Sequence, residues 1–318
     1  MLKKNHILII IEKYMKQYLI FSVFLFLILN SSAQQIPHYT QYVYNMQILN
    51  PAFVGAKADL SISLLSRQQW VGLEGAPKTQ TFSINARTAK GLGIGAIVVR
   101  DKIGFSETTN INLDASYTII TSIYSRLAFG LKGGFLIFNN NLSNAITPDN
   151  DIYNSTNGNF LNIGMGALFY SQKFYVGLSI PYLFETPQFY GLETDEKNNI
   201  ASNANYFLSA GASFELNDNL NFRPSTILKY ASNLPVSIDF NTSFQYKKII
   251  ETGISYRYEN SISALFAVVF KEKFRVGYTY DYKVAEYGIN LSSHELILNI
   301  DLNLNRSSRW LPYSSCYF

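Results

Sequence analysis

Few side chains in this sequence are suited to acid–base, nucleophilic or metal chemistry. Its histidines are His6, His38 and His294, and its single cysteine is Cys316. No HxxxH or HExxH spacing occurs, so no metal site is predicted. One cysteine excludes both an intramolecular disulfide and a metal site built from cysteines. We therefore expect no cofactor.

The neighbours Ser293 and His294 are residue types that nucleophilic catalysis uses. Adjacent residues of a strand point to opposite faces, however, so a direct pair is disfavoured there. No GxSxG elbow or phosphate-binding loop occurs. The glycines of "GLGIGA" alternate with other residues, which fits inward positions of a strand and not a dinucleotide loop. We predict a protein that is not an enzyme.

Composition points away from an ordinary soluble domain. The chain is 47% hydrophobic and 15% aromatic, but only 15% charged, against about 25% charged in typical domains. Its formal net charge of +4 is mild, and no basic run or nucleic-acid motif accompanies it, so nucleic acid is not an expected partner.

The N-terminus is typical of a secretory signal peptide. A lysine, Lys16, precedes an apolar run over 18–29, and a small-residue site follows at 31–33. The run is too short for a comfortable membrane helix. We predict a signal peptide over 1–33, cleaved between Ala33 and Gln34, with Met15 as an alternative start. No later apolar run is long enough for a helical span.

Alternation with a period of two dominates the chain after residue 58. In "TFSINAR", for example, Phe82, Ile84 and Ala86 share one face. About fourteen such segments recur, at lengths that suit tilted membrane strands. The predicted strands are 59–67, 79–88, 90–101, 108–119, 125–138, 159–171, 173–181, 204–216, 219–230, 235–246, 249–258, 260–270, 273–283 and 293–304.

The connections between these segments alternate in length. Even-numbered strands are followed by short turns, whereas most odd-numbered strands are followed by longer loops, including 102–107. This asymmetry is typical of an outer-membrane barrel with periplasmic turns and extracellular loops. A soluble sandwich or propeller also alternates and is the alternative. We predict an all-β transmembrane outer-membrane β-barrel of about 14 antiparallel strands over 59–304, in contact with outer-membrane lipids, and a tail over 305–318.

The polar face of the predicted strands carries charges of both signs. Balanced charge favours a salt-bridged, partly filled interior over a strongly ion-selective channel, whereas simple solvation is the favoured role of each single residue. The expected inward cations are Arg87, Arg126, Lys132, Arg223, Lys229, Arg257, Arg275 and Lys283, and the expected anions are Asp59, Asp114, Glu215, Asp239, Glu251, Asp281 and Asp301.

An uncharged stretch, "YNMQILNPAFVGA" at 44–56, lies just before the first strand. By strand parity the surrounding segment, 34–58, starts on the periplasmic side. An apolar segment there must bury itself. We predict that it forms either a plug in the barrel mouth or a collar on the rim, with contacts at Asn50, Pro51, Phe53 and Gly55.

The loop "RQQWVGLEGAPK" at 67–78 is a second candidate site, on the extracellular side by parity. Trp and Arg are favoured anchors of protein interfaces. We predict that this loop contacts a partner protein as it emerges from the barrel. The alternative is that the loop folds inward and narrows the lumen. Its candidate contact residues are Arg67, Gln69, Trp70, Glu74 and Pro77.

Four stretches resemble the PorP/SprF family, outer-membrane barrels of the type IX secretion system of Bacteroidetes. They are 34–56, 66–86, 91–96 and 292–302. The most specific parts are "NPAF" at 50–53, "QW" at 69–70 and "APKT" at 76–79; "SHEL" contributes the candidate residues His294 and Glu295.

The resemblance implies a non-enzymatic role in exporting or attaching large surface proteins that carry a type B C-terminal sorting domain. It also implies contact with the secretion machinery, including its periplasmic ring and peptidoglycan-linking components. A porin or solute channel is the alternative function.

Overall fold

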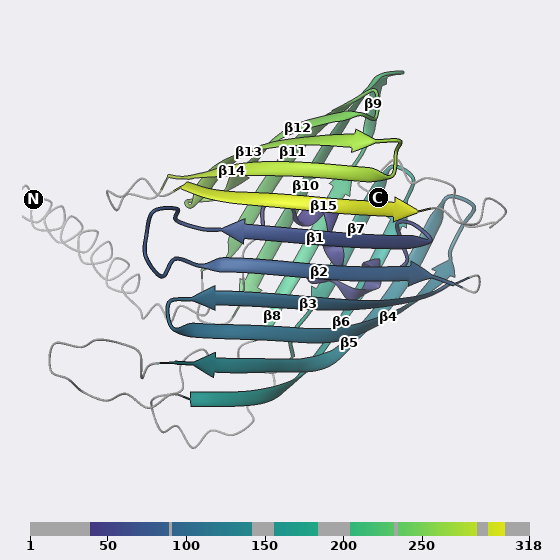
Figure 1. Cartoon of the computed structure of the whole chain (residues 1–318). Coiled ribbons are helices and arrows are strands. Elements are labelled where there is room, and N and C mark those ends of the chain that lie inside the picture. Colours follow the sequence, from purple (N-terminus) through teal and green to yellow (C-terminus); the bar gives the residue numbers. More distant parts are fainter. Residues whose placement is uncertain are drawn as a thin grey trace, which may run out of the picture. The chain divides into compact units, whose positions relative to one another are not determined.

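We analysed a computed structural model of the chain. It describes residues 39–88, 91–141, 156–183, 204–231, 235–284 and 292–302, all within one compact unit that begins at Gln35. The expected signal peptide over 1–33 and tail over 305–318 lie outside these residues. The described strands form a closed antiparallel β-barrel (Figure 1).

The barrel has fourteen strands, because β8 and β9 are one strand interrupted at Ser213 and both pair with β10. Pairing of β1 with β15, and of β10 with β11, makes the sheet continuous around the ring. This confirms the predicted fold class. The strands are β1 Leu60–Gln68, β2 Lys78–Arg87, β3 Leu92–Ile103, β4 Ser106–Ile120, β5 Ser125–Asn140, β6 Thr156–Ser171, β7 Phe174–Ile180, β8 Asn205–Ala212, β9 Phe214–Asn217, β10 Leu220–Ala231, β11 Ser237–Tyr246, β12 Ile250–Arg257, β13 Ser261–Phe270, β14 Phe274–Lys283 and β15 Ser292–Leu302.

Short turns gather at one rim, as predicted. The turn after β11 has two residues with positive φ, Lys247 (48°) and Lys248 (57°), and the turn after β13 has Lys271 and Glu272, both at 53°. Two central residues with positive φ define the tight hairpin turn that matches strand twist. We call this end the short-turn rim and the opposite end the long-loop rim.

One predicted long loop was wrong. Residues 102–107 are mostly strand: β3 runs to Ile103, β4 starts at Ser106, and only Gly104 and Phe105 lie between them. Cross-strand pairing continues up to Ile103 opposite Ser106. Gly104 has a φ of 58° and so supplies the left-handed conformation that this tight turn needs.

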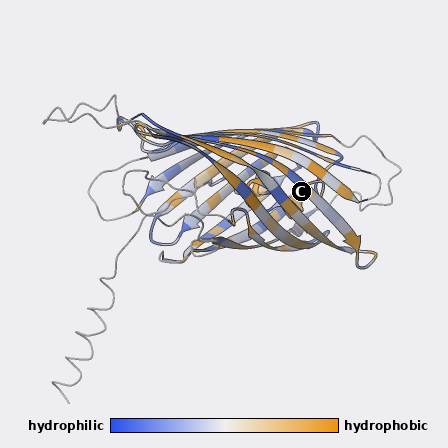
Figure 2. Ribbon diagram, turned by 90° about the horizontal axis from the view of Figure 1, so that it is seen from below, coloured by the Kyte–Doolittle hydropathy of each residue, from blue (hydrophilic) through white to orange (hydrophobic). Residues whose placement is uncertain are grey.

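Polar and apolar residues alternate along the strands (Figure 2), and buried and exposed positions alternate with them. In β4, Asn112, Asp114 and Ser116 are buried, while Leu113 between them is 69% exposed. The outward apolar side chains suit a lipid surface. Within the described residues, no helix is both long and apolar enough to span a membrane.

The alternation holds in β9, although burial does not. Glu215 lies opposite Asn221, which lies opposite the buried Gln245, so Glu215 is on the inward face, as predicted. All four residues of β9 are nevertheless exposed. The register shifts only beyond this pair, between Leu220 and Asn221, where a bulge is invisible to a strict alternation pattern.

Residues 39–58, which we call the lumen segment, precede β1. They contain three short 3-10 helices: η1 Tyr42–Tyr44, η2 Met46–Ile48 and η3 Pro51–Phe53. Every residue from Tyr39 to Ala56 is buried. The segment lies within the ring of strands, where its purple trace is visible behind β1 and β2 (Figure 1).

Candidate functional site: the barrel interior

The lumen segment runs lengthwise through the barrel. Thr40 contacts Asp281 and Glu295, near the long-loop ends of β14 and β15. At its other end, Lys57 pairs with Asp301, near the short-turn rim. We expected a periplasmic segment that begins at that rim; its first described residues instead lie in the opposite half of the barrel.

A buried charge cluster holds the beginning of the segment. The Glu295 carboxylate accepts the backbone N–H of Thr40 (3.0 Å) and of Gln41 (2.7 Å). Arg67 forms ion pairs with Glu295 (2.9 Å) and Asp281 (2.6 Å). Arg67 therefore lies in β1 and faces inward; the sequence placed it at the end of the first strand and counted it among the contacts of the loop. Each charge is paired, as burial requires.

Neighbouring groups complete this end. The Tyr39 hydroxyl lies 3.2 Å from the Thr81 hydroxyl. Arg257 forms two 2.8 Å hydrogen bonds to Asp239 and donates to the Tyr39 carbonyl at 3.5 Å. The segment thus contacts strands from both sides of the ring.

A second charge cluster surrounds Tyr44. The Arg275 guanidinium lies over the Tyr44 ring, 4.6 Å from its centre, and binds both oxygens of Glu251 (3.1 and 3.2 Å). Asn299 donates to the Tyr44 carbonyl (3.1 Å). Lys57 pairs with Asp301 at 2.7 Å.

The middle of the segment is held from the other wall. Gln47 donates to Asp114 of β4 (2.8 Å). The Lys132 ammonium of β5 donates to the backbone carbonyls of Gln47 (3.2 Å) and Ile48 (3.1 Å), which close η2. A lysine beside the last carbonyls of a helical turn satisfies groups that the turn itself leaves unpaired.

Asn50 and Pro51 shape the turn into η3. The Asn50 side chain accepts the Ala52 N–H (2.9 Å) and donates to the carbonyls of Ala167 (3.1 Å) and Leu178 (3.4 Å). Pro51 occupies the first helical position, where a missing N–H costs nothing. The motif residues thus fix the segment to β6 and β7.

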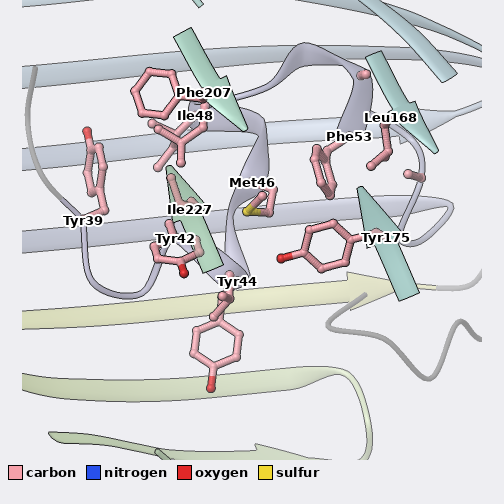
Figure 3. Packing of buried hydrophobic residues seen from close by; sticks show 14 of the residues in the cluster. Tyr39, Tyr42, Tyr44, Met46, Ile48, Phe53, Leu168, Tyr175, Phe207 and Ile227 are labelled. Carbon is pink, nitrogen blue, oxygen red and sulfur yellow. The ribbon is translucent and has the colours of Figure 1, made fainter. Parts of the chain in front are cut away.

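Aromatic and aliphatic side chains fill the space between the segment and the wall. The Phe53 ring meets Tyr175 edge to face, with ring centres 5.6 Å apart (Figure 3). Phe207 and Ile227 approach the segment from β8 and β10. Edge-to-face contact is a favoured arrangement of aromatic rings. The barrel interior therefore contains a packed apolar core as well as charge clusters.

Inward glycines make room for the segment's backbone. A Cβ at Gly130 of β5 would collide with the backbone of Pro51 and Ala52, and one at Gly166 of β6 would collide with the Asn50 side chain. Gly55 has a φ of 70° and turns the chain towards β1. Further strand glycines whose Cβ would meet the segment are Gly93, Gly95, Gly177 and Gly277.

The loop over 69–77 continues from β1 and β2. The Gln69 N–H donates to the carbonyl of Pro77, which is buried (2.9 Å). Trp70 has a φ of 49°, and the Lys283 ammonium lies 5.4 Å above its ring. Glu74 is exposed. Three loop residues therefore pack at the rim, and Glu74 faces solvent.

His294 and Glu295 point to opposite faces of β15. Glu295 is inside, whereas His294 is on the outer face, 2.5 Å from the Tyr278 hydroxyl and beside the Tyr280 ring. The buried Ser293 side chain is thus on the other face from His294, as the strand argument required. Among the described residues, no cluster of three or more metal-binding side chains occurs.

Sequence reasoning missed the residues that hold the lumen segment. Alternation correctly put Asp114, Lys132, Glu251, Arg275 and Asp281 inside, but assigned them mainly to solvation. Their partners are groups of the distant lumen segment, such as Gln47 and Thr40, or charges on other strands, and such contacts leave no local pattern. The inward glycines were the available signal, because a strand uses glycine where another backbone approaches closely.

The fold and the filled interior define an outer-membrane β-barrel. Residues 31–300 match the family described as type IX secretion system membrane protein PorP/SprF, and the chain belongs to that family. No curated protein matches the sequence.

Solved structures with similar folds include three outer-membrane barrels. They are the CymD monoaromatic hydrocarbon channel (12% identity, 84% of this chain and 94% of that one, TM-score 0.49), the Ralstonia pickettii toluene transporter TbuX (9%, 80% and 92%, 0.48) and the Acinetobacter baumannii outer membrane protein Omp33 (8%, 78% and 100%, 0.48).

Proposed function

We propose that this protein is a non-enzymatic accessory of type IX secretion that assists export or surface attachment of a large partner protein with a type B C-terminal sorting domain. Membership of the PorP/SprF family supports the secretion role. The partner class and contact with the periplasmic ring and peptidoglycan-linking components follow the family resemblance.

The observation that carries this proposal is the filled lumen. Residues 39–58 are fixed by hydrogen bonds to β4, β5, β6, β7 and β15. A diffusion porin needs an aqueous channel, which a tightly packed segment obstructs. We therefore assign the lumen segment the role of a plug. Contacts with other proteins are then made by the two rims and the outer face of the barrel.

The orientation follows from the loop asymmetry. Outer-membrane barrels place short turns in the periplasm and longer loops outside. The short-turn rim then faces the periplasmic machinery, and the long-loop rim with Trp70 and Glu74 faces the emerging partner. Glu74 is the exposed member of the candidate contact patch.

The test compares surface and secreted proteins of wild-type cells, a gene deletion, and the deletion complemented with the wild-type gene. Loss of one or a few large proteins with type B sorting domains, restored by complementation, is the expected result. Loss of all type IX cargo would make the protein a core component instead. An unchanged profile with altered small-solute uptake would replace the proposal with the porin function.

A further inference from the structure

The outer face of β1, β2, β3 and β15 carries a groove of about 390 Å³ that the interior site does not use. Its apolar side is lined by Leu64, Phe82, Val98, Leu296 and Leu298. These side chains point away from the lumen, so the groove opens on the membrane-facing surface.

Three rows of outward residues cross this face in register. The apolar row, Leu64 opposite Phe82, is followed towards the long-loop rim by Ser66 opposite Gln80, which in turn lies opposite Arg100. The last row places Gln68 opposite Lys78 and Lys78 opposite Lys102. Polarity and positive charge therefore increase from the groove to the rim.

The opposition of Lys78 and Lys102 is unfavourable by itself. Like charges directly opposite on neighbouring strands destabilise a sheet. Arg100 adds a third cation. The one nearby carboxylate among the described residues, Glu107, lies opposite Lys102 on β4, but it binds Arg100 at 2.7 Å. Within the described part of the chain, neither lysine forms an ion pair. The patch retains a surplus of positive charge that an anion would neutralise.

Other strands present a different surface at this rim. On β12 and β14 the outward residues are aromatic: Tyr256, Tyr280 and Tyr282. Tyrosine at this level is the ordinary interfacial girdle. The cationic residues over β2 and β3 are thus a local feature that general membrane anchoring does not require.

We infer that this face binds a phosphorylated glycolipid of the outer leaflet. An acyl chain lies in the groove over Leu64 and Phe82, and a phosphate lies against Lys78, Lys102 and Arg100. The hydroxyl and amide groups of the intermediate row, Ser66 and Gln80, suit the sugar hydroxyls between chain and phosphate. Cationic patches of this kind recognise anionic lipid head groups.

The test is native mass spectrometry of the purified full chain in detergent, with bisphosphorylated lipid A as the probe. Dephosphorylated lipid A, phosphatidylglycerol and inorganic phosphate are the comparison ligands. The wild type should retain bisphosphorylated lipid A in preference to all three. Removing both lysines (Lys78→Gln with Lys102→Gln) should weaken binding about 30-fold, and added salt should weaken wild-type binding.

Two control variants, one for the lysines and one for the groove, show whether an effect on binding is specific to this face. Lys248→Gln with Lys271→Gln removes two exposed lysines at the other rim and should leave binding unchanged. Ser66→Trp should block the groove and abolish retention with all charges intact, whereas Thr252→Trp, outward on β12, should not. Equal binding by the Lys78/Lys102 variant, or by dephosphorylated lipid A, would overturn the phosphate site; equal binding of phosphatidylglycerol would overturn its glycolipid specificity.

Discussion

The carboxylate of Glu295 accepts the backbone N–H of Gln41 over 2.7 Å, although 254 positions separate the two residues. Glu295 belongs to the final strand, and Gln41 to the beginning of the lumen segment. The same carboxylate binds Arg67, so one buried group joins the segment to both strands that close the barrel.

Replacing Glu295 with Gln should loosen the beginning of the lumen segment. The change removes a charge that pairs with Arg67 and accepts two backbone N–H groups, and hydrogen bonds to charged groups are worth about 1.5–3 kcal/mol each. A buried reporter, Val43→Cys in a Cys316→Ser background, should react with maleimide at least about tenfold faster.

The exposed Glu74 provides the control for this measurement. Glu74→Gln removes the same charge from the surface loop and should leave the labelling rate of the reporter unchanged. If Glu295→Gln also leaves that rate unchanged, the carboxylate does not hold the segment.

Gly130→Ala should destabilise the filled barrel. The added methyl group would meet the backbone of Pro51 and Ala52, and overpacking of this kind costs about 1–3 kcal/mol. A lower unfolding midpoint and a measurable ion conductance in planar bilayers are expected. Gly133→Ala on the same strand meets nothing within 4 Å and should behave like the wild type. Equal behaviour of the two variants would contradict the close contact.

Asn50 should respond differently to two substitutions. Asn50→Asp keeps the acceptor for the Ala52 N–H but loses the donor to the carbonyls of Ala167 and Leu178, and it buries a new charge. Asn50→Ala loses all three hydrogen bonds, including the cap, which is worth about 1 kcal/mol. Both substitutions should lower the denaturant concentration at the midpoint of unfolding. If both variants form the barrel and unfold at the wild-type midpoint, Asn50 does not anchor the segment.

Glu251→Gln should lower the unfolding free energy by about 3–5 kcal/mol, because it removes the buried anion that Arg275 and Arg223 share, and Asp301 lies 3.8 Å from Arg275. Glu272→Gln removes an exposed partner of Lys248, 3.9 Å away, and should change it by less than about 1 kcal/mol. Chemical unfolding in detergent measures both. Similar losses for the two variants would show that burial does not set the strength of these pairs.

Strand periodicity predicted the barrel well because the membrane and the polar interior impose opposite demands on successive residues. Thus Leu113 and Asp114 were assigned to the correct faces. The same rule missed the break at Ser213 and the two-residue turn after Ile103, where strand pairing overrides a polar, glycine-containing sequence.

The interior contacts were less predictable. Asn50, Pro51 and Phe53 stood out by their motif, and they do lie together: η3 packs against β4, β5 and β6, and Asn50 and Phe53 also contact β7. Arg67 and Glu295, however, meet only because the first and last strands are paired. A single sequence shows which residues are charged, but it does not show which residues they pair with in the fold.

The lengthwise path of residues 39–58 constrains how the protein is made. Thr40 lies deep in the half of the barrel farthest from the start of β1, yet only twenty positions separate it from Leu60. The strands must therefore wrap around the segment, or the segment must thread in before the final strand docks on the first. If the strands close around the segment, biogenesis of this barrel is coupled to the loading of its own N-terminal region.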